Sequence, residues 1–397
     1  MLPAWIRLDR HEVAGGLGDV GLFVPLAVAL IAVNGLDATA VFAVAGIAYV
    51  ATALYFRVPV PVQPLKAFAA AAIALQLDPA VIAAGALTMA AAMLVLSAGG
   101  LATWLARHFP TVLVRGIQAA VALLLAKAAV ELAQRGSWEG SPAIDPAVSL
   151  GLAVAACAVL LALSAGDRRG AVPGTLLVLG AGVAVGLGVG GLPDVDLGPQ
   201  APALAVPDGA AFATALTSLV IAQLPLTFGN SVVATADAER AYFGARARRV
   251  LPHRLSASIG ASNALAGLTG AMPVCHGAGG VTAHYKLGAR TAGATLSVGV
   301  LYLALALAFG ASLPALLGLL VPGVLAGMLL YVAIQHALLA GSLHRASDRA
   351  IAAGVGVVTL ASGNLAVGFA AGAAVVGVRA LTRRREVPGV GFEPTRP

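Results

Sequence analysis

Charged residues are scarce in this chain, since aspartate, glutamate, lysine and arginine together make up 10% of its 397 residues. A water-soluble globular protein carries about 25% charged residues, which cover its surface, so the shortage excludes a soluble globule. Hydrophobic residues make up 59% of the chain, and the mean hydropathy is +0.93. The composition therefore predicts a polytopic, all-α membrane protein, with 48 glycines that suit closely packed helices.

Cysteine is almost absent, with only Cys157 and Cys275, each inside an apolar segment. This scarcity excludes a disulfide framework and a Cys-x-x-Cys site. The chain also lacks the Gly-x-Ser-x-Gly, His-Glu-x-x-His and Walker patterns. No further ligand is suitably spaced from Cys275 and His276 to complete a metal site. We therefore expect no enzyme, no metal and no cofactor.

Acidic residues are the rarer charged class, at 17 against 24 basic residues, which gives a net charge of +7. A basic protein can bind nucleic acid, but basic residues in a membrane protein usually mark its cytoplasmic loops. The stretch from Arg240 to Arg254 is therefore interpreted as an inside loop. We expect no nucleic-acid partner.

Long apolar runs alternate with polar turns such as Asn34–Asp37 and Gly166–Gly170. The runs predict fourteen transmembrane segments. These are residues 13–34, 38–56, 59–76, 79–98, 110–132, 147–165, 171–190, 210–236, 254–270, 273–287, 291–310, 313–339, 349–363 and 364–380.

The distribution of arginine predicts the orientation of these segments. With the N-terminus in the cytoplasm, the arginine clusters all fall on the cytoplasmic side, as basic residues prefer, and only Arg135 falls outside. Lys66, Arg115 and Lys127 lie in or beside segments. One helix more or fewer would put several clusters on the wrong face. The clusters are Arg168–Arg169, Arg240–Arg254, Arg345–Arg349 and Arg379–Arg385.

Seven segments precede an acidic loop and seven follow it, so the second half is predicted to run through the membrane inverted. Inverted repeats are typical of transporters. The predicted organisation is residues 1–12 as a cytoplasmic N-terminus without a signal peptide, 13–190 as the first repeat, 191–209 as an external loop, 210–380 as the second repeat and 381–397 as a disordered cytoplasmic tail.

The third segment contains the proline-rich stretch Val58–Phe68. Proline removes backbone donors and favours an extended chain before it, so a helix begins only near Pro64. From there to Gln76 is about 13 residues, or roughly 20 Å of helix, which is shorter than the hydrocarbon core of about 30 Å. The stretch predicts a half-helix with Lys66 in its first turn, beginning inside the membrane.

The matching segment of the second half, Ala271–Thr282, repeats this pattern. An extended run through Pro273 leads into a short helix from about His276 to Leu287. The N-termini of the two half-helices would meet near the midplane, where their unpaired N–H groups and positive dipole ends favour an anion. The alternative interpretation is that both stretches are ordinary kinks and packing devices.

Polar residues outside the two half-helices add candidates. Gln223, Thr227, Asn230 and Ser231 recur at helical spacing in the eighth segment and can form one polar face, of which Asn230 is the preferred binding candidate. The alternative is ordinary hydrogen bonding between helices. Asp19 is an acid in the first segment, with either a functional or an interfacial role.

Four motifs resemble the molybdate transporter family, which is related to the SulP sulfate permeases and more distantly to uracil/xanthine permeases. The resemblance spans residues 13 to about 380 and implies seven plus seven inverted helices, divided into a core and a gate domain, with the substrate between the third and tenth helices. It also implies molybdate as the substrate, where the residues alone indicate an anion. The motifs are Gly18–Pro25, Pro61–Lys66, Gly229–Asp237 and Met272–Gly280.

The chain departs from its SulP relatives in two respects. It ends about 17 residues after the last predicted helix, so we expect no regulation through a STAS domain. Asn230 stands where SulP relatives often carry a glutamate in the eighth helix, so a coupling proton would need Asp19 or His276, or coupling would be absent.

These observations predict a secondary transporter of a tetrahedral oxyanion in the inner membrane, with both termini cytoplasmic. Molybdate is the first candidate, with sulfate or tungstate as alternatives. A nucleobase permease would require an acid in the eighth or tenth helix, and a membrane enzyme would require a catalytic set that is missing. A homodimer and proton coupling remain open. The predicted substrate-binding residues are Gln63, Lys66, Asn230, Cys275, His276, Gly277, Gly279, Gly280 and Thr282.

Overall fold

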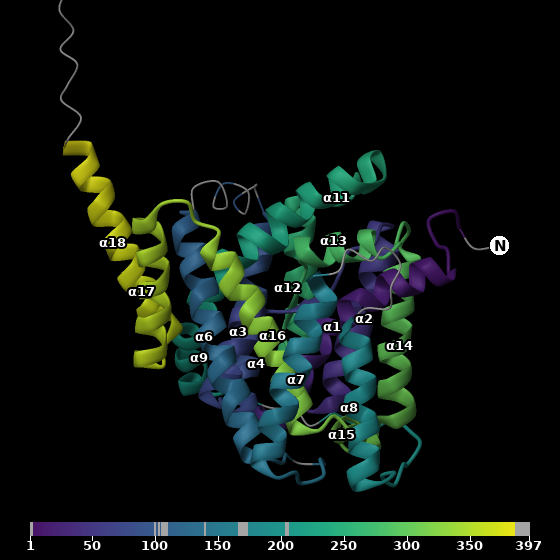
Figure 1. The fold of residues 1–397 in the computed structure, drawn as a ribbon. Coiled ribbons are helices and arrows are strands. Elements are labelled where there is room, and N and C mark those ends of the chain that lie inside the picture. Colours follow the sequence, from purple (N-terminus) through teal and green to yellow (C-terminus); the bar gives the residue numbers. More distant parts are fainter. Residues whose placement is uncertain are drawn as a thin grey trace, which may run out of the picture.

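Helices make up nearly all of the regular structure, as Figure 1 shows. The computed structural model describes residues 3–98, 101, 104, 110–138, 140–165, 174–202 and 206–385. The predicted turn at 166–170, the start of the seventh predicted segment and residues 386–397 of the predicted tail lie outside these ranges.

Each predicted segment overlaps a helix. The first half contains α1 (Arg10–Asn34), α2 (Ala38–Phe56), strand β1 (Gln63–Pro64), α3 (Lys66–Leu75), α4 (Pro79–Ser97), α6 (Thr111–Arg135), α7 (Pro146–Ala165) and α8 (Gly174–Gly190). The second half contains α9 (Gly209–Ala215), η1 (Leu216–Val220), α10 (Ile221–Leu226), η2 (Thr227–Ala234), α11 (Thr235–Phe243), η3 (Gly244–Ala247), α12 (Pro252–Thr269), β2 (Val274–Cys275), α13 (Ala278–Lys286), α14 (Gly293–Phe309), η4 (Gly310–Ser312), α15 (Leu313–Gly318), α16 (Pro322–Gly341), α17 (Ala346–Ser362) and α18 (Leu365–Arg385).

Eight helical stretches of the described residues are long and apolar enough to cross a membrane. The chain is therefore a multi-pass membrane protein. Helices α4 and α12 pack together, as do α2 and α14, while α16 packs on α6 and α7. Helices α17 and α18 lie side by side at one edge of the body, and α14 lies at the opposite edge in Figure 1.

Local sequence signals explain where several helices begin. The carboxylate of Asp9 accepts hydrogen bonds from the amides of His11 and Glu12 and so caps α1, and Asp37 caps α2 through the amide of Ala40 at 2.7 Å. Capping satisfies N–H groups that lack a partner inside the helix. The left-handed Gly35, at φ +70°, ends α1.

Close helix packing depends on glycine where α2 meets α14. A Cβ added to Gly46 would lie 2.9 Å from the carbonyl oxygen of Gly299, and one added to Gly299 would lie 2.9 Å from the amide nitrogen of Val50. Both distances are too short for real atoms, so the two backbones approach only because these residues have no side chain. The pair α2–α14 thereby forms a tight wall beside α1.

The third and tenth predicted segments each run extended and then turn into a short helix, as expected. Strands β1 and β2 pair antiparallel, with Gln63 opposite Cys275 and Pro64 opposite Val274. Both helices begin two residues later than predicted, because Pro64 and His276 belong to the extended runs. We call the paired strands together with the first turns of α3 and α13 the crossing.

Two buried asparagines hold these segments in place. Asn263 of α12 donates to the carbonyl of Val274 and accepts from its amide, each at 2.8 Å. Asn34 of α1 donates to the carbonyls of Ala72 and Leu77 at 2.8 and 2.9 Å, at the end of α3. Each asparagine satisfies backbone groups that a broken helix leaves open inside an apolar body.

The eighth predicted segment is one long helical stretch whose winding changes along its length. It runs from α9 to η3, and its sections η1 and η2 are π-helical. The wider turns of η2 include Asn230 and Ser231. π-helical turns are rare and frequently occur at functional sites. We therefore treat this stretch as the third wall of the crossing.

Candidate functional site

The crossing brings the N-termini of α3 and α13 together. The amides of Lys66 and Ala67 have no hydrogen-bond partner among the described residues, and the next amide, of Phe68, donates to the side-chain oxygen of Gln223 at 2.9 Å. In α13 the amides of Ala278 and Gly279 likewise have no partner among those residues. Each half-helix therefore begins beside the paired strands with unpaired amides and a positive dipole end, which is an arrangement suited to an anion.

A hydrogen-bonded chain of side chains fixes the position of Lys66. Its ammonium donates to the Gln63 side-chain oxygen at 2.9 Å, and the Gln63 amide nitrogen donates to Asp19 at 2.5 Å. The other Asp19 oxygen accepts from the hydroxyl of Tyr49 at 2.6 Å. Because the ammonium and the carboxylate each require a different end of the amide, the orientation of Gln63 is determined.

The glycines around the start of α13 have two different environments. A Cβ added to Gly277 or Gly280 would collide with the side chain of Gln63. Gly279 is exposed, and a Cβ built there would meet nothing within 4 Å. Gly277 and Gly280 therefore make room for Gln63, whereas Gly279 faces open space beside the unpaired amides.

Cys275 lies in β2 and His276 directly follows it. His276 Nδ1 is 2.8 Å from the Pro61 carbonyl and its Nε2 is 3.1 Å from the Ser258 hydroxyl. The Cys275 thiol lies 3.6 Å from the Pro64 carbonyl. Both side chains are buried, so they tie the two extended runs to each other and to α12.

Some polar residues of the eighth segment have structural hydrogen-bond partners, and others lie near the start of α13. Gln223 and Thr227 bond to each other at 3.0 Å, and Gln223 caps α3, so these two have structural partners. Asn230 is half-buried, and its side-chain nitrogen would lie 3.5 Å from a Cβ at Gly277. Thr282 is half-buried on α13, where it donates to the Ala278 carbonyl at 3.0 Å.

Lys66 also lines a cavity of about 270 Å³. The opposite wall comes from α1, α8 and α16, including Thr175, Gln335 and His336. Since a water molecule occupies about 30 Å³ of liquid, this space holds several waters. Nothing in the sequence pattern indicated that α16 would face Lys66, because the two are far apart in the chain.

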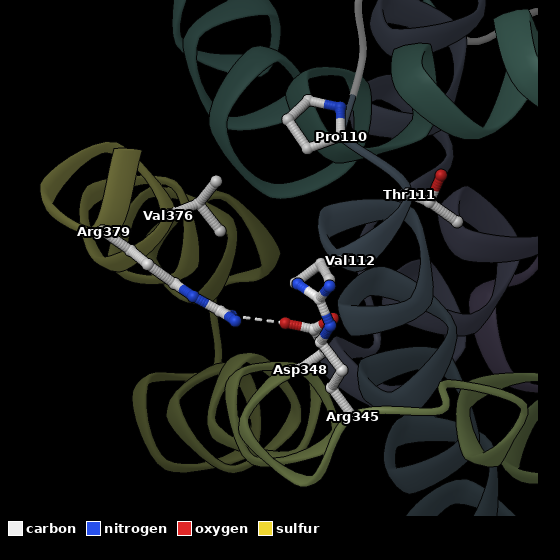
Figure 2. A pocket seen from close by; sticks show the side chains of 7 residues that line it. All are labelled: Pro110, Thr111, Val112, Arg345, Asp348, Val376 and Arg379. Atoms are coloured by element: carbon white, nitrogen blue, oxygen red, sulfur yellow. Dashed lines mark hydrogen bonds and ion pairs between the residues drawn. The ribbon is translucent and has the colours of Figure 1, made fainter. Parts of the chain in front are cut away.

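A larger cavity of about 400 Å³ lies away from the crossing, between the start of α6 and α17–α18. Figure 2 shows its lining, in which Asp348 points toward Arg379 and forms an ion pair with it, beside Arg345. No unpaired half-helix end reaches this cavity. Among the described residues, no group of three or more histidine, cysteine or acidic side chains is placed to hold a metal ion.

Solved structures share this fold. The transmembrane domain of a cyanobacterium bicarbonate transporter, BicA, superposes with a TM-score of 0.66 at 18% identity, covering 91% of this chain and 97% of that one. Murine Slc26a9, an anion transporter in the inward-facing state, gives 0.63 at 16% identity, covering 96% and 69%. These likenesses establish an SLC26-like fold.

Proteins of similar sequence align with this chain over most of its length and most of their own. The chain is 28% identical to "Molybdate transporter 2" of Arabidopsis thaliana, over 91% of this chain and 85% of the relative. It is 30% identical to "Molybdate transporter 1" of the same plant, over 92% and 87%. A Chlamydomonas reinhardtii protein, "Molybdate transporter 1", is 29% identical over 95% and 92%.

A family model described as "Molybdate transporter of MFS superfamily" matches residues 11–125 and 215–336. The two matched stretches cover more than half of the chain and contain both half-helices, α1 and η2. The resemblance inferred from the four motifs is thus confirmed, and the chain belongs to the molybdate transporter family.

Proposed function

We propose that this protein is a secondary transporter of a tetrahedral oxyanion, molybdate first, working by alternating access across the inner membrane. The observation that carries the proposal is the crossing, where both α3 and α13 begin with free amides next to the paired strands and the ammonium of Lys66 bonds to Gln63 of β1. Membership of the molybdate transporter family and the fold shared with anion transporters support the same substrate class.

The anion would be held mainly by backbone groups. The amides of Lys66, Ala67, Ala278 and Gly279 would donate to its oxygens, and Lys66 would supply the opposite charge. Gly279 leaves space for close approach, and Asn230 and Thr282 stand nearby as neutral donors. Gln63 would act chiefly through Lys66, which it positions, because its amide group already bonds to Lys66 and Asp19.

The fourteen-crossing, inverted seven-plus-seven arrangement is part of this proposal, with repeats at residues 13–190 and 210–380 and both termini cytoplasmic. The antiparallel pairing of β1 with β2 supports it, since equivalent segments of two inverted repeats meet there in opposite directions. The core would comprise α1–α4 and α9–α14, and the gate the remaining helices. The cavity beside Lys66 lies between the two groups.

Uptake by proteoliposomes tests the substrate. Purified protein should accumulate labelled molybdate, and unlabelled tungstate and sulfate should compete according to their fit, whereas uracil should not compete. Protein-free liposomes provide the control. Uptake of uracil without any uptake or competition by the oxyanions would overturn the proposal and indicate a nucleobase permease.

A further inference from the structure

Two buried histidines near the crossing differ in how their rings are satisfied. Both ring nitrogens of His276 lie within hydrogen-bond distance of oxygen atoms. Neither ring nitrogen of His284, on α13, makes a well-formed hydrogen bond with a described residue, although the side chain is fully buried and the backbone of Pro59 lies close to the ring. A buried polar ring without partners is costly, so His284 requires an explanation that His276 does not.

The nearest charged group to His284 is the carboxylate of Asp19. The distance from His284 Nε2 to Asp19 Oδ2 is 3.8 Å, and the side chains are 0% and 2% exposed. That distance is too long for a hydrogen bond but close enough for an ion pair. One proton added to His284 would pair the two residues and satisfy one of the orphaned nitrogens.

The other polar groups around the pair are already engaged or lie farther away. Asp19 accepts from Tyr49 of α2 and from Gln63 of β1, and the α14 hydroxyl of Tyr302 has no partner among the described residues. Glu12, near the start of α1, accepts from the amides of Arg290 and Thr291. From α11, Tyr242 bonds to Thr282, and the carboxylate of Glu239 is buried without a described partner.

We propose that Asp19 and His284 together form a proton-binding site that loads one proton with each oxyanion. The inference rests on the proposed oxyanion function and deepens it, since it names the coupling ion and the pair of residues that hold it. It differs from the expectation from sequence, in which Asp19 or His276 acted alone.

Charge explains why proton and oxyanion would bind together. With His284 neutral, the charges of Asp19 and Lys66 cancel, so an arriving dianion meets a site of no net charge with a carboxylate behind it. With His284 protonated, the three residues carry one net positive charge. Binding of the proton therefore favours the dianion, and by linkage the dianion favours the proton equally.

The hydrogen-bonded chain connects the pair to the anion site. Asp19 bonds to Gln63 at 2.5 Å, and Gln63 bonds to Lys66 at 2.9 Å. Pairing of Asp19 with a protonated His284 would draw part of the carboxylate charge away from Gln63 and Lys66. The ammonium is then less compensated and attracts the oxyanion more strongly.

The test is to measure anion binding and proton uptake together on the purified full-length protein. Calorimetry in weakly buffered detergent solution reports molybdate binding, and a pH-indicator dye reports protons. Molybdate affinity should fall as pH rises, by up to about tenfold per pH unit for one linked proton. Within that pH range, we expect about one proton to be taken up for each molybdate bound. His284→Gln should bind molybdate with proton uptake abolished, whereas His253→Gln, which removes an exposed histidine, should behave as wild type.

Several outcomes would overturn the proposal. Molybdate binding by the wild type with no proton uptake between pH 5 and 8 would refute it, and this result needs no variant to fold. Full proton uptake by His284→Gln would place the proton on another residue. If a folded His276→Asn variant also lost proton uptake, that residue would be His276. A wild type that binds neither molybdate nor sulfate would refute the oxyanion function itself, and the coupling inference with it.

Discussion

Lys66 stands out from its surroundings by its accessibility. From Val58 to Ala74, every residue is buried except Lys66, which is half-buried and lines the cavity between α1 and α16. A single accessible ammonium in a buried apolar stretch is expected to act on something that enters that space.

Replacing this cation should therefore weaken anion binding. We predict that Lys66→Gln lowers molybdate affinity at least tenfold, or about 1.4 kcal/mol, because a charge in a partly dry cavity interacts more strongly than one in water. Calorimetric titration measures the effect, and a circular dichroism spectrum verifies the fold. Unchanged affinity in a folded variant would return Lys66 to a structural role.

The residues of the site differ in how far the sequence identified them. Lys66, Gln63 and Asp19 were candidates because polar groups are rare in apolar segments, and the structure joins them in one chain of hydrogen bonds. His284 was missed because its spacing from Asp19 carries no pattern. Only the packing of α13 against α1 brings the two residues together.

Gly279 offers a steric test at the start of α13. A side chain there projects into open space, so Gly279→Val should fold normally but crowd the free amides and reduce transport by at least tenfold. Gly277→Val should in addition displace Gln63 and lower thermal stability. Liposome uptake and melting temperatures in detergent separate the two effects, and normal uptake by Gly279→Val would show that the anion binds elsewhere.

The strand pairing at the crossing depends on Asn263. Asn263→Ala would leave the buried amide and carbonyl of Val274 without this partner, so we expect a loss of about 1–3 kcal/mol of stability. The matched control is Asn364→Ala, which removes a capping bond at the start of α18 from a half-buried asparagine. Equal melting temperatures for the two variants would contradict the role assigned to Asn263.

At the scale of elements, the half-helices were predictable because proline restricts the backbone in a known way. Their starts moved by two residues, since β1 and β2 pair only when the two segments meet, and that contact is not local. The π-helical turns of η2 carry no comparable signal. Their winding depends on packing against other elements, including α12 and α13.

At the scale of the molecule, the arrangement of α4 with α12 and α2 with α14 follows from contacts distant in sequence. Amino-acid composition established that the chain is a membrane protein, and motifs indicated its family, but neither specifies which glycines touch which helix. The close approach of Gly46 and Gly299 illustrates this, because each lies in an apolar run whose sequence does not identify the helix that it meets.

The charges buried at the crossing have an electrical consequence. In the proposed cycle the empty site, with Asp19, Lys66 and a neutral His284, carries no net charge, while the site loaded with a dianion and one proton carries one negative charge. Membrane voltage would then act on the loaded step and leave the return of the empty site unaffected. Moving one charge through the full field is worth about 2.3 kcal/mol per 100 mV.

Proteoliposomes with imposed potassium diffusion potentials measure this directly. Initial molybdate uptake should rise when the interior is made positive and fall when it is made negative, whereas wild-type uptake that ignores voltage would imply two protons per dianion. A negative potential inside the cell would therefore oppose the inward movement of the loaded site, which carries one negative charge. Net accumulation would have to draw on the pH difference across the membrane to overcome its voltage.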